Sequence, residues 1–191
     1  MKILGQKDYR DMAWKNGKGR TVELLRIPHP KVQDLFSLRL SIASMTESGP
    51  FSHYPGIERT IILLEGKGVV LDFVDEIKMN LNVKLKPIQF AGEAEISAHL
   101  IDGPIREFNV MGARDAVEAF VEVHQKLNSL SVGGDGDHYL YICEGTAMVG
   151  NDLVKKDDLI ITTHGEKVSL TSKEGFTGIE IKTHKIFSAK K

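Results

Sequence analysis

A pattern of two apolar strands joined by a Glu-Gly turn occurs twice along this chain of 191 residues. The first copy runs Ile61-Ile-Leu-Leu-Glu-Gly-Lys-Gly-Val-Val70, and the second runs Leu140-Tyr-Ile-Cys-Glu-Gly-Thr-Ala-Met-Val149, with the turn glycines 79 positions apart. A related segment follows each copy at a shorter offset, Val83–Phe90 after the first and Leu153–Ile160 after the second. Repetition on this scale predicts two structural units of the same kind.

The other regular segments are also short and strand-like. Apolar or alternating runs with β-branched residues occupy 21–27, 38–43, 60–64, 69–71, 116–123, 139–143, 159–161 and 178–181. Turn residues such as Asn16-Gly17, Ser48-Gly49-Pro50 and Pro55-Gly56 separate them. No stretch beyond a dozen residues has a convincing helical period, and one or two short helices near Gln6–Asp11 are all we expect. The chain is therefore predicted to be all-β, a sandwich or a barrel.

The repeated unit resembles the cupin barrel, a relative of the jelly roll that holds a small ligand in its mouth. Two copies predict a bicupin, with two jelly-roll-like β-barrels in tandem. We place the first barrel, with a ligand pocket, at residues 1–112 and a second, degenerate barrel at residues 113–191. The alternative is a coincidental match between two ordinary hairpins.

Composition excludes several classes of protein. Lys and Arg number 25 and Asp and Glu number 26, so a net charge of −1 gives no reason to expect a nucleic-acid or anionic-membrane partner. The single cysteine, Cys143, allows no intramolecular disulfide. The longest apolar run, Tyr139–Cys143, is far too short to cross a bilayer, and the N-terminus turns polar too early for a signal peptide. We expect a reduced, cytoplasmic protein.

The residues at the cupin metal positions are not metal ligands. Metal-binding cupins gather three His and one Glu, in a pattern that resembles G-x5-H-x-H-x3,4-E-x6-G followed by a later His. Aligning the first copy on its turn glycine puts Ser52 and Tyr54 at the paired His positions and Arg59 at the Glu position. The second copy keeps only His138, at the Glu position. We therefore expect no metal and no cofactor, and we expect the seven histidines to be surface or packing residues.

Arg59 replaces a metal ligand by a fixed cation. A guanidinium pairs well with carboxylates through two parallel hydrogen bonds, so this substitution favours anion recognition. An arginine on a strand edge that faces solvent is the alternative.

Four segments of the sequence resemble, in their order and spacing, the motifs of one known family. They are Trp14-Lys-Asn-Gly-Lys-Gly-Arg-Thr-Val-Glu23, Ser48-Gly-Pro-Phe-Ser-His-Tyr-Pro-Gly-Ile-Glu-Arg59, Phe90-Ala-Gly-Glu93, and Leu100-Ile-Asp-Gly-Pro104 continuing to Phe108-Asn-Val-Met111. These resemble the HutD/Ves family over about residues 10–182. Ser48, Tyr54 and Glu107 depart from its usual Asp, Phe and Asp. The family's closing M-x-R-R pattern is loosened here to Met111-Gly-Ala-Arg114, which puts any role of Arg114 in doubt.

The resemblance implies a metal-free bicupin with a ligand pocket in its first barrel. It further implies a link to histidine utilisation, where the family is thought to sense or buffer an intermediate, with small carboxylates such as formate, formylglutamate or urocanate as suggested ligands. The other branch is associated with stress and cold response, and no catalytic activity is established for the family.

The candidate ligand-binding residues come from the same segments. They are Trp14, Asn16, Thr21, Glu23, Phe51, Ser52, Tyr54, Arg59, Asn109 and Met111, and we predict no catalytic residue and no metal ligand among them. Alternation places Thr21 with Glu23 on one face, and Asn109 with Met111 on another. Trp14 supplies a flat apolar wall. Structural roles are the alternative for each residue: Trp14 as a core plug, Asn16 as a turn residue, and Glu23 paired with Arg59.

Three functions remain open. The first, which we favour, is a non-enzymatic binder of a small carboxylate. The second is a metal-independent isomerase or lyase, in which Glu23 with Tyr54 or His53 would be the acid–base pair, although His53 is out of phase with its neighbours. The third is a protein-interaction module, because the second barrel has few pocket-like polar residues and fits a packing or homodimer contact better.

Overall fold

The computed structural model describes residues 1–75 and 77–186, and it confirms the all-β fold. Within those residues the helical structure is a single 3-10 turn, η1 (Gln6–Asp8), inside the region where a short helix was expected. No helix in the described part is long and apolar enough to cross a membrane. The chain forms two compact units: the first unit is residues 10–117, and the second unit is residues 1–9 together with 118–186.

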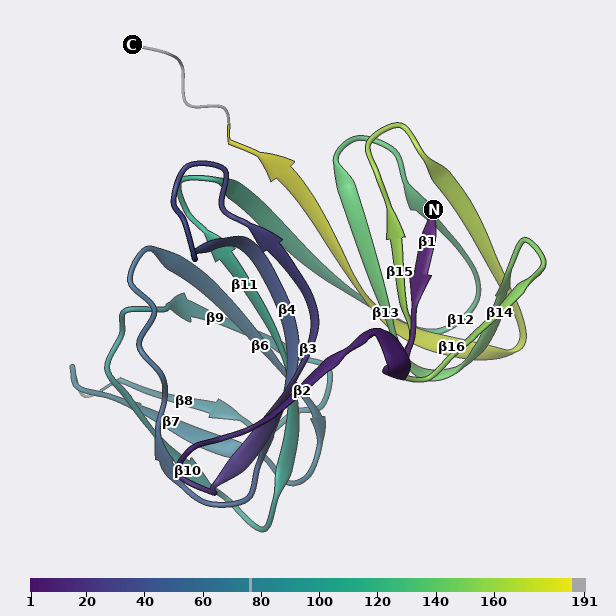
Figure 1. The fold of residues 1–191 in the computed structure, drawn as a ribbon. Coiled ribbons are helices and arrows are strands. Elements are labelled where there is room, and N and C mark those ends of the chain that lie inside the picture. Colours follow the sequence, from purple (N-terminus) through teal and green to yellow (C-terminus); the bar gives the residue numbers. More distant parts are fainter. Residues whose placement is uncertain (76, 187–191) are drawn as a thin grey trace. The chain divides into compact units, whose positions relative to one another are not determined.

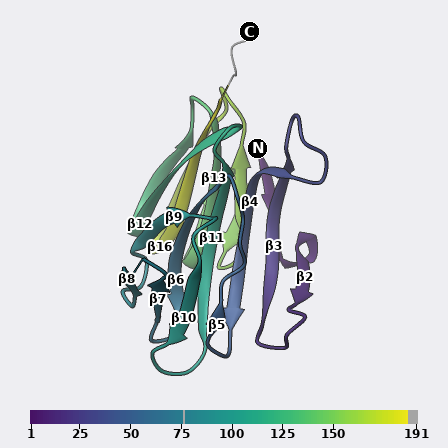
Figure 2. The same cartoon turned by 90° about the vertical axis from the view of Figure 1, so that its left-hand side faces the viewer.

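The first unit is built from two antiparallel sheets. The larger sheet has the order β2-β3-β4-β11-β6-β9, and the smaller one has the order β5-β10-β7-β8. The strands are β2 (Arg10–Ala13), β3 (Gly19–Pro28), β4 (Phe36–Met45), β5 (Gly49–Pro50), β6 (Ile57–Glu65), β7 (Val69–Phe73), β8 (Lys78–Leu81), β9 (Pro87–Ala91), β10 (Ile96–Leu100) and β11 (Ile105–Ala113). Figure 2 shows β2, β3, β4 and β11 side by side in the larger sheet.

Alternating side chains of both sheets form the core of the first unit. Ile61 and Leu63 of β6 pack with Val69 and Leu71 of β7, and with Phe90 of β9. The same period-2 alternation that buries these residues directs β3, β4 and β11 side chains to the same inner face. The inner face therefore continues from an apolar region on β6 to the strands that carry the sequence motifs.

The second unit contains one six-stranded antiparallel sheet. Its order is β1-β15-β13-β16-β12, and β14 pairs with β13. The strands are β1 (Lys2–Leu4), β12 (Val117–Gly133), β13 (Asp137–Val149), β14 (Asp152–Lys155), β15 (Leu159–Thr162) and β16 (Lys167–Lys185). Its core includes Leu140, Ile142, Ile160 and Phe176. Figure 1 shows β1, at the purple N-terminal end, beside β15.

The division of the chain differs in detail from the one drawn on the sequence. The sequence places residues 1–112 in the first barrel, whereas the contact boundary lies after Val117 and the first nine residues join the other unit. The physical reason is the antiparallel pairing of β1 with β15, which aligns Lys2 with Ile161 and Leu4 with Leu159. Residues 187–191 of the predicted second barrel lie outside the described residues.

Equivalent hydrogen bonds mark the repeat in both units. The Leu85 N–H donates to the Leu63 carbonyl oxygen at 3.0 Å, and the Asp157 N–H donates to that of Ile142 at 2.9 Å. Leu85 and Asp157 both have positive φ, at 61° and 71°. The repeat in the sequence aligns Leu63 with Ile142, in agreement with these hydrogen bonds. It aligns Leu85 with Lys155, whereas the hydrogen bonds make Leu85 equivalent to Asp157, two residues further along the chain.

Candidate functional site

A cavity of about 450 Å³ opens into the first unit. Its lining residues are Met12, Ala13, Trp14, Lys15, Asn16, Thr21, Arg39, Ser41, Ala43, Met45, Pro50, Phe51, Ser52, Tyr54, Arg59, Glu107, Asn109 and Met111. They come from β2 with its following turn, from the inner face of β3, β4, β11 and β6, and from β5 with the segment after it. The volume suits a small organic ligand.

Strand register explains which side chains meet on the cavity wall. Residues directly opposite in an antiparallel pair share a face, so they form rows across the sheet. Across β4, β11 and β6 the rows are Arg39, Met111 and Arg59; Ser41, Asn109 and Ile61; and Ala43, Glu107 and Leu63. Two arginines therefore stand on either side of Met111, with an amide and a carboxylate in the neighbouring rows.

Arg59 is buried in this wall, with a residue exposure of 6%. Its Nη2 donates a hydrogen bond of 2.7 Å to Oδ1 of Asn109, and Nδ2 of Asn109 donates one of 3.1 Å to Oε1 of Glu107. Nη1 makes only a long contact of 3.5 Å with the Ser52 carbonyl oxygen. Nε of Arg59 and Oε2 of Glu107 are buried without a hydrogen-bond partner. The solvent-facing alternative for Arg59 is therefore wrong.

Three aromatic rings lie close to the Arg59 guanidinium. The Cζ of Arg59 lies 5.0 Å from the ring centre of Phe51, 5.2 Å from that of Phe90 and 5.8 Å from that of Tyr54. Cation–π attraction of this kind stabilises an arginine whose charge has lost water. The rings fix the guanidinium plane without consuming its N–H donors, which leaves donors available to an anion.

Burial dominates the electrostatics of the two charged ends of this network. It raises the pKa of Glu107 above its ordinary value, although the Arg59 cation and the hydrogen bond from Asn109 act in the opposite direction. Burial also lowers the pKa of Arg59, against the effect of Glu107. Among the described carboxylates none forms an ion pair with Arg59, and the hydrogen-bonded link from this cation to Glu107 passes through the Asn109 amide.

Glu23 forms an ion pair with a residue that the sequence did not single out. The Nε of Arg39 donates to Oε2 of Glu23 at 2.6 Å, and both side chains are nearly buried. Nη1 of Arg39 also lies 3.7 Å from the sulfur of Met111. The alternative of a Glu23–Arg59 pair is therefore wrong: Glu23 is not among the lining residues, and it neutralises Arg39, which is.

The Trp-Lys-Asn-Gly segment forms the turn between β2 and β3 at the cavity mouth. Nε1 of Trp14 donates to Oγ1 of Thr21 at 2.8 Å, which fixes the indole in the wall. The Asn16 Oδ1 accepts a hydrogen bond from the Lys18 N–H at 3.0 Å, so this exposed rim residue also has a turn role. A Cβ at Gly19 would lie 2.9 Å from the Trp14 ring, so the glycine permits this close packing.

The remaining motif residues hold the segment that carries Ser52 and Tyr54. The Tyr54 N–H donates to the Gly92 carbonyl oxygen, and the Gly92 N–H donates to that of Ile57, both at 2.7 Å. Arg114 donates to the Ile57 carbonyl oxygen at 3.2 Å and pairs with Glu93. Arg114, whose role the sequence left in doubt, thus supports the cavity wall from outside it.

Nine of the ten candidate residues line the cavity, and Glu23 is the exception. Sequence reasoning missed Arg39 and Ser41 of β4, and it noted Glu107 only as a departure from a motif. Alternation from Asn109 was sufficient to find Glu107, since the two share a face of β11. Finding Arg39 required the register of β4 against β11, which no short-range pattern contains.

The sequence of this chain matches one family model and is similar to several known proteins. The HutD family model matches residues 6–177. Protein Ves from Citrobacter koseri is 34% identical over 145 residues, which cover 75% of this chain and 73% of the relative. A 21.2 kDa protein in the hutC 3′ region of Pseudomonas putida is 39% identical over 113 residues, covering 59% and 58%.

Solved structures show the same fold. HutD from Pseudomonas fluorescens SBW25, in a formate condition, superposes with a TM-score of 0.83 at 27% identity, covering 96% of this chain and 98% of that one. A conserved protein of Pseudomonas aeruginosa PAO1 gives 0.82 at 29% identity, with 95% and 97% covered. A cupin 2 barrel protein from Leptotrichia buccalis gives 0.59 at 12% identity, with 96% and 99% covered, which supports the cupin fold alone.

Proposed function

Because the chain belongs to the HutD family, we propose that it is a non-enzymatic protein that binds a small carboxylate in the first-unit cavity. Arg59 carries the proposal: a buried cation lines the cavity, no described carboxylate pairs with it, and Nε has no partner. A carboxylate that enters the cavity supplies both the charge and the acceptor oxygens that Arg59 lacks.

The wall around Arg59 also suits a small, flat anion. Trp14, Phe51 and Tyr54 supply apolar and aromatic surface, while Ser41 and Asn109 supply neutral polar groups. No histidine lines the cavity among the described residues, and Glu23 is engaged by Arg39. These features disfavour Glu23 and His53 as the proton-transfer group that acid–base turnover needs in reach of the substrate, and they leave Glu107 and Tyr54 as lining groups that can exchange a proton.

The relatives suggest which carboxylates to test. One is named for its place in the hutC 3′ region, and a HutD structure was obtained in a formate condition. We therefore extend the proposal to a role in histidine utilisation, in which the protein senses or buffers an acidic intermediate, with the stress-response branch as the other setting.

Thermal-shift curves with formate, formylglutamate, urocanate, histidine and glutamate test the proposal. A ligand at 100 times its dissociation constant stabilises the folded state by about 2.7 kcal/mol, so binding raises the melting temperature measurably. Arg59→Ala should abolish that shift. Arg106→Ala is the matched control, because Arg106 lies on the opposite face of β11 and pairs with Glu65 at 2.8 Å. Flat curves for every compound would favour the protein-interaction module instead.

A further inference from the structure

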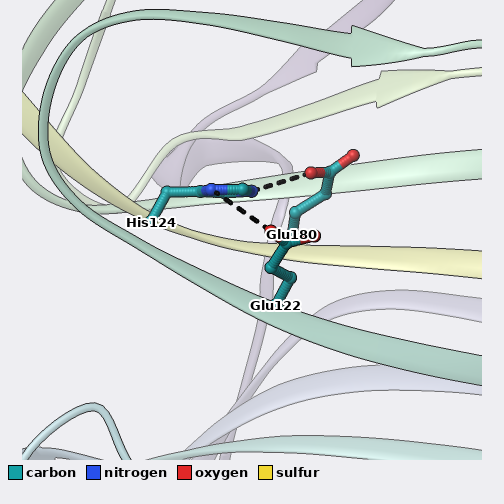
Figure 3. A group of neighbouring side chains, drawn as sticks. All are labelled: Glu122, His124 and Glu180. Carbon is teal, nitrogen blue, oxygen red and sulfur yellow. Dashed lines mark hydrogen bonds and ion pairs between the residues drawn. The ribbon is translucent and has the colours of Figure 1, made fainter.

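A second polar cluster lies in the second unit, on three strands that are neighbours in its sheet. It consists of Glu122 and His124 on β12, His138 on β13 and Glu180 on β16. Glu180 lies opposite the core residue Leu140 in the β13–β16 pairing, so its carboxylate points to the core side of the sheet. Figure 3 shows Glu122, His124 and Glu180 directed toward one another.

The ligand atoms of this cluster are close together. Oε2 of Glu180 lies 2.8 Å from Nε2 of His124, and its Oε1 lies 2.8 Å from Nδ1 of His138. Nδ1 of His124 lies 3.9 Å from Oε1 of Glu122. One ligand atom from each of Glu122, His124 and Glu180 falls within 4.8 Å of the others. Imidazole and carboxylate together form a donor set for divalent first-row metals.

The cluster already attracts a cation. Nζ of Lys182 lies 2.8 Å from Oε2 of Glu122 and 3.9 Å from Oε2 of Glu180. Glu180 is 3% exposed, whereas Lys182 is partly exposed and has a long flexible stem. The ammonium group therefore marks a position where the two carboxylates stabilise positive charge, and it can leave that position without disturbing the core.

An independent observation comes from β15. Thr162 is fully buried, and its Oγ1 has no hydrogen-bond partner. It stands directly opposite His138 in the β13–β15 pairing, so its hydroxyl lies on the same face as the cluster. A buried hydroxyl without a partner is unfavourable, and the protein's own groups do not satisfy this one. Thr162 is two strands away from Glu180 in the sheet, so its unpaired hydroxyl marks the His138 end of the cluster and not the metal position itself.

We propose that Glu122, His124 and Glu180 form a binding site for a divalent transition metal such as Zn²⁺, with the Lys182 ammonium displaced on binding. His138 is a positioning residue, because it orients Glu180 through Oε1, while the metal would replace the contact between Oε2 of Glu180 and Nε2 of His124. Tetrahedral ligands of zinc lie about 3.4 Å apart, at metal distances of about 2.0–2.2 Å. The exposed Glu122 side chain has the freedom to close the remaining gap.

Zinc titration of the metal-depleted full chain tests this site, with heat of binding and melting temperature as readouts. Wild type should bind one Zn²⁺ and melt at a higher temperature, and His124→Gln and Glu122→Gln should each weaken binding about tenfold or more. Glu118→Gln is the matched control, because Glu118 is an exposed carboxylate on the same strand. Lys182→Met should strengthen binding, since it removes the competing cation.

Cobalt supplies a readout that folding alone does not give. Co²⁺ in the site should produce visible absorption bands that disappear in His124→Gln and shift in position in His138→Gln. A stoichiometry of zero would overturn the proposal, as would zinc binding that is unchanged in His124→Gln and Glu122→Gln. Weaker binding in Lys182→Met would also contradict it, because a plain salt-bridge network requires the lysine. Glu122→Gln and Lys182→Met change side chains that reach the surface, so they keep the test valid if His124→Gln fails to fold.

Discussion

The Arg59 guanidinium and the Glu107 carboxylate occupy the same cavity wall without touching, and the Asn109 amide connects them through hydrogen bonds of 2.7 and 3.1 Å. The amide accepts from the cation and donates to the carboxylate, so its dipole is aligned with both charges. A direct ion pair would saturate Arg59, whereas this arrangement keeps its charge in place and leaves donors for a ligand.

Asn109→Asp should therefore abolish the free cation. The new carboxylate would lie within hydrogen-bond distance of Arg59 and would pair with it in place of a ligand. We expect affinity for the best carboxylate to fall about tenfold or more, equivalent to about 1.4 kcal/mol, in a thermal-shift titration. Asn128→Asp, an exposed site on β12, serves as the control. Unchanged affinity would show that Arg59 does not contact the ligand.

Glu107→Gln should change how stability depends on pH. Burial raises the pKa of Glu107 in the folded state above its unfolded value. In the pH range between those values the folded state holds more protons than the unfolded state, so wild-type stability falls as the pH rises. The two proteins should match below the unfolded pKa of about 4.3 and diverge above it, with the variant more stable. Urea denaturation at a series of pH values measures the difference, and parallel curves would contradict the expectation.

Gly92→Ala should destabilise the wall that carries Tyr54. A Cβ there would lie 2.6 Å from the Tyr54 carbonyl oxygen and 2.8 Å from that of Ile57, and these are backbone atoms that cannot rotate away. We expect a loss of about 1–3 kcal/mol in denaturant unfolding, together with weaker ligand binding. Gly49→Ala is the control, because its nearest neighbour would be the Lys18 side chain at 4.0 Å. Equal stability of the two variants would argue against a tight contact at Gly92.

Much of the fold is visible in the sequence because core burial leaves short-range patterns. All eight expected strand segments fall within or overlap observed strands, among them those of β4, β6 and β13. β11 was not among them, because Glu107 and Asn109 point inward and Arg106 faces the other side, which hides the usual alternation. When a strand lines a polar cavity, its inward-facing residues are polar, so the sequence lacks the apolar alternation by which a strand is recognised.

The sequence predicts the site residues that belong to its motifs. It does not predict those that reach the cavity only because two distant strands pair. Arg39 reaches the cavity through the register of β4 against β11, and that pairing joins residues far apart in the chain. His124 was expected to be a surface or packing residue, like every other histidine. Its nearness to Glu180 depends on β12 and β16 being neighbours, which the cupin ligand pattern does not contain.

Glu23→Gln separates binding from catalysis. In wild type Glu23 neutralises Arg39, whose side chain lines the cavity. Removing the Glu23 charge should cost about 1–3 kcal/mol of stability. It should also strengthen carboxylate binding, because Arg39 then lacks an ion-pair partner and can pair with the ligand. Denaturant unfolding and thermal-shift titration measure the two effects. If wild type converts any of the test carboxylates and the variant does not, Glu23 is instead an acid–base residue.

Trp14, the single tryptophan of the chain, makes ligand entry directly observable. Its indole lines the cavity and donates to Thr21 at 2.8 Å, so a carboxylate bound near Arg59 should change its fluorescence intensity or emission maximum. Trp14→Phe and Thr21→Val should each cost about 1 kcal/mol of stability, and the double variant should cost less than their sum, since both remove the same hydrogen bond. Arg59→Ala should leave emission insensitive to the ligand. A melting-temperature shift without any change in emission would place the ligand outside this cavity.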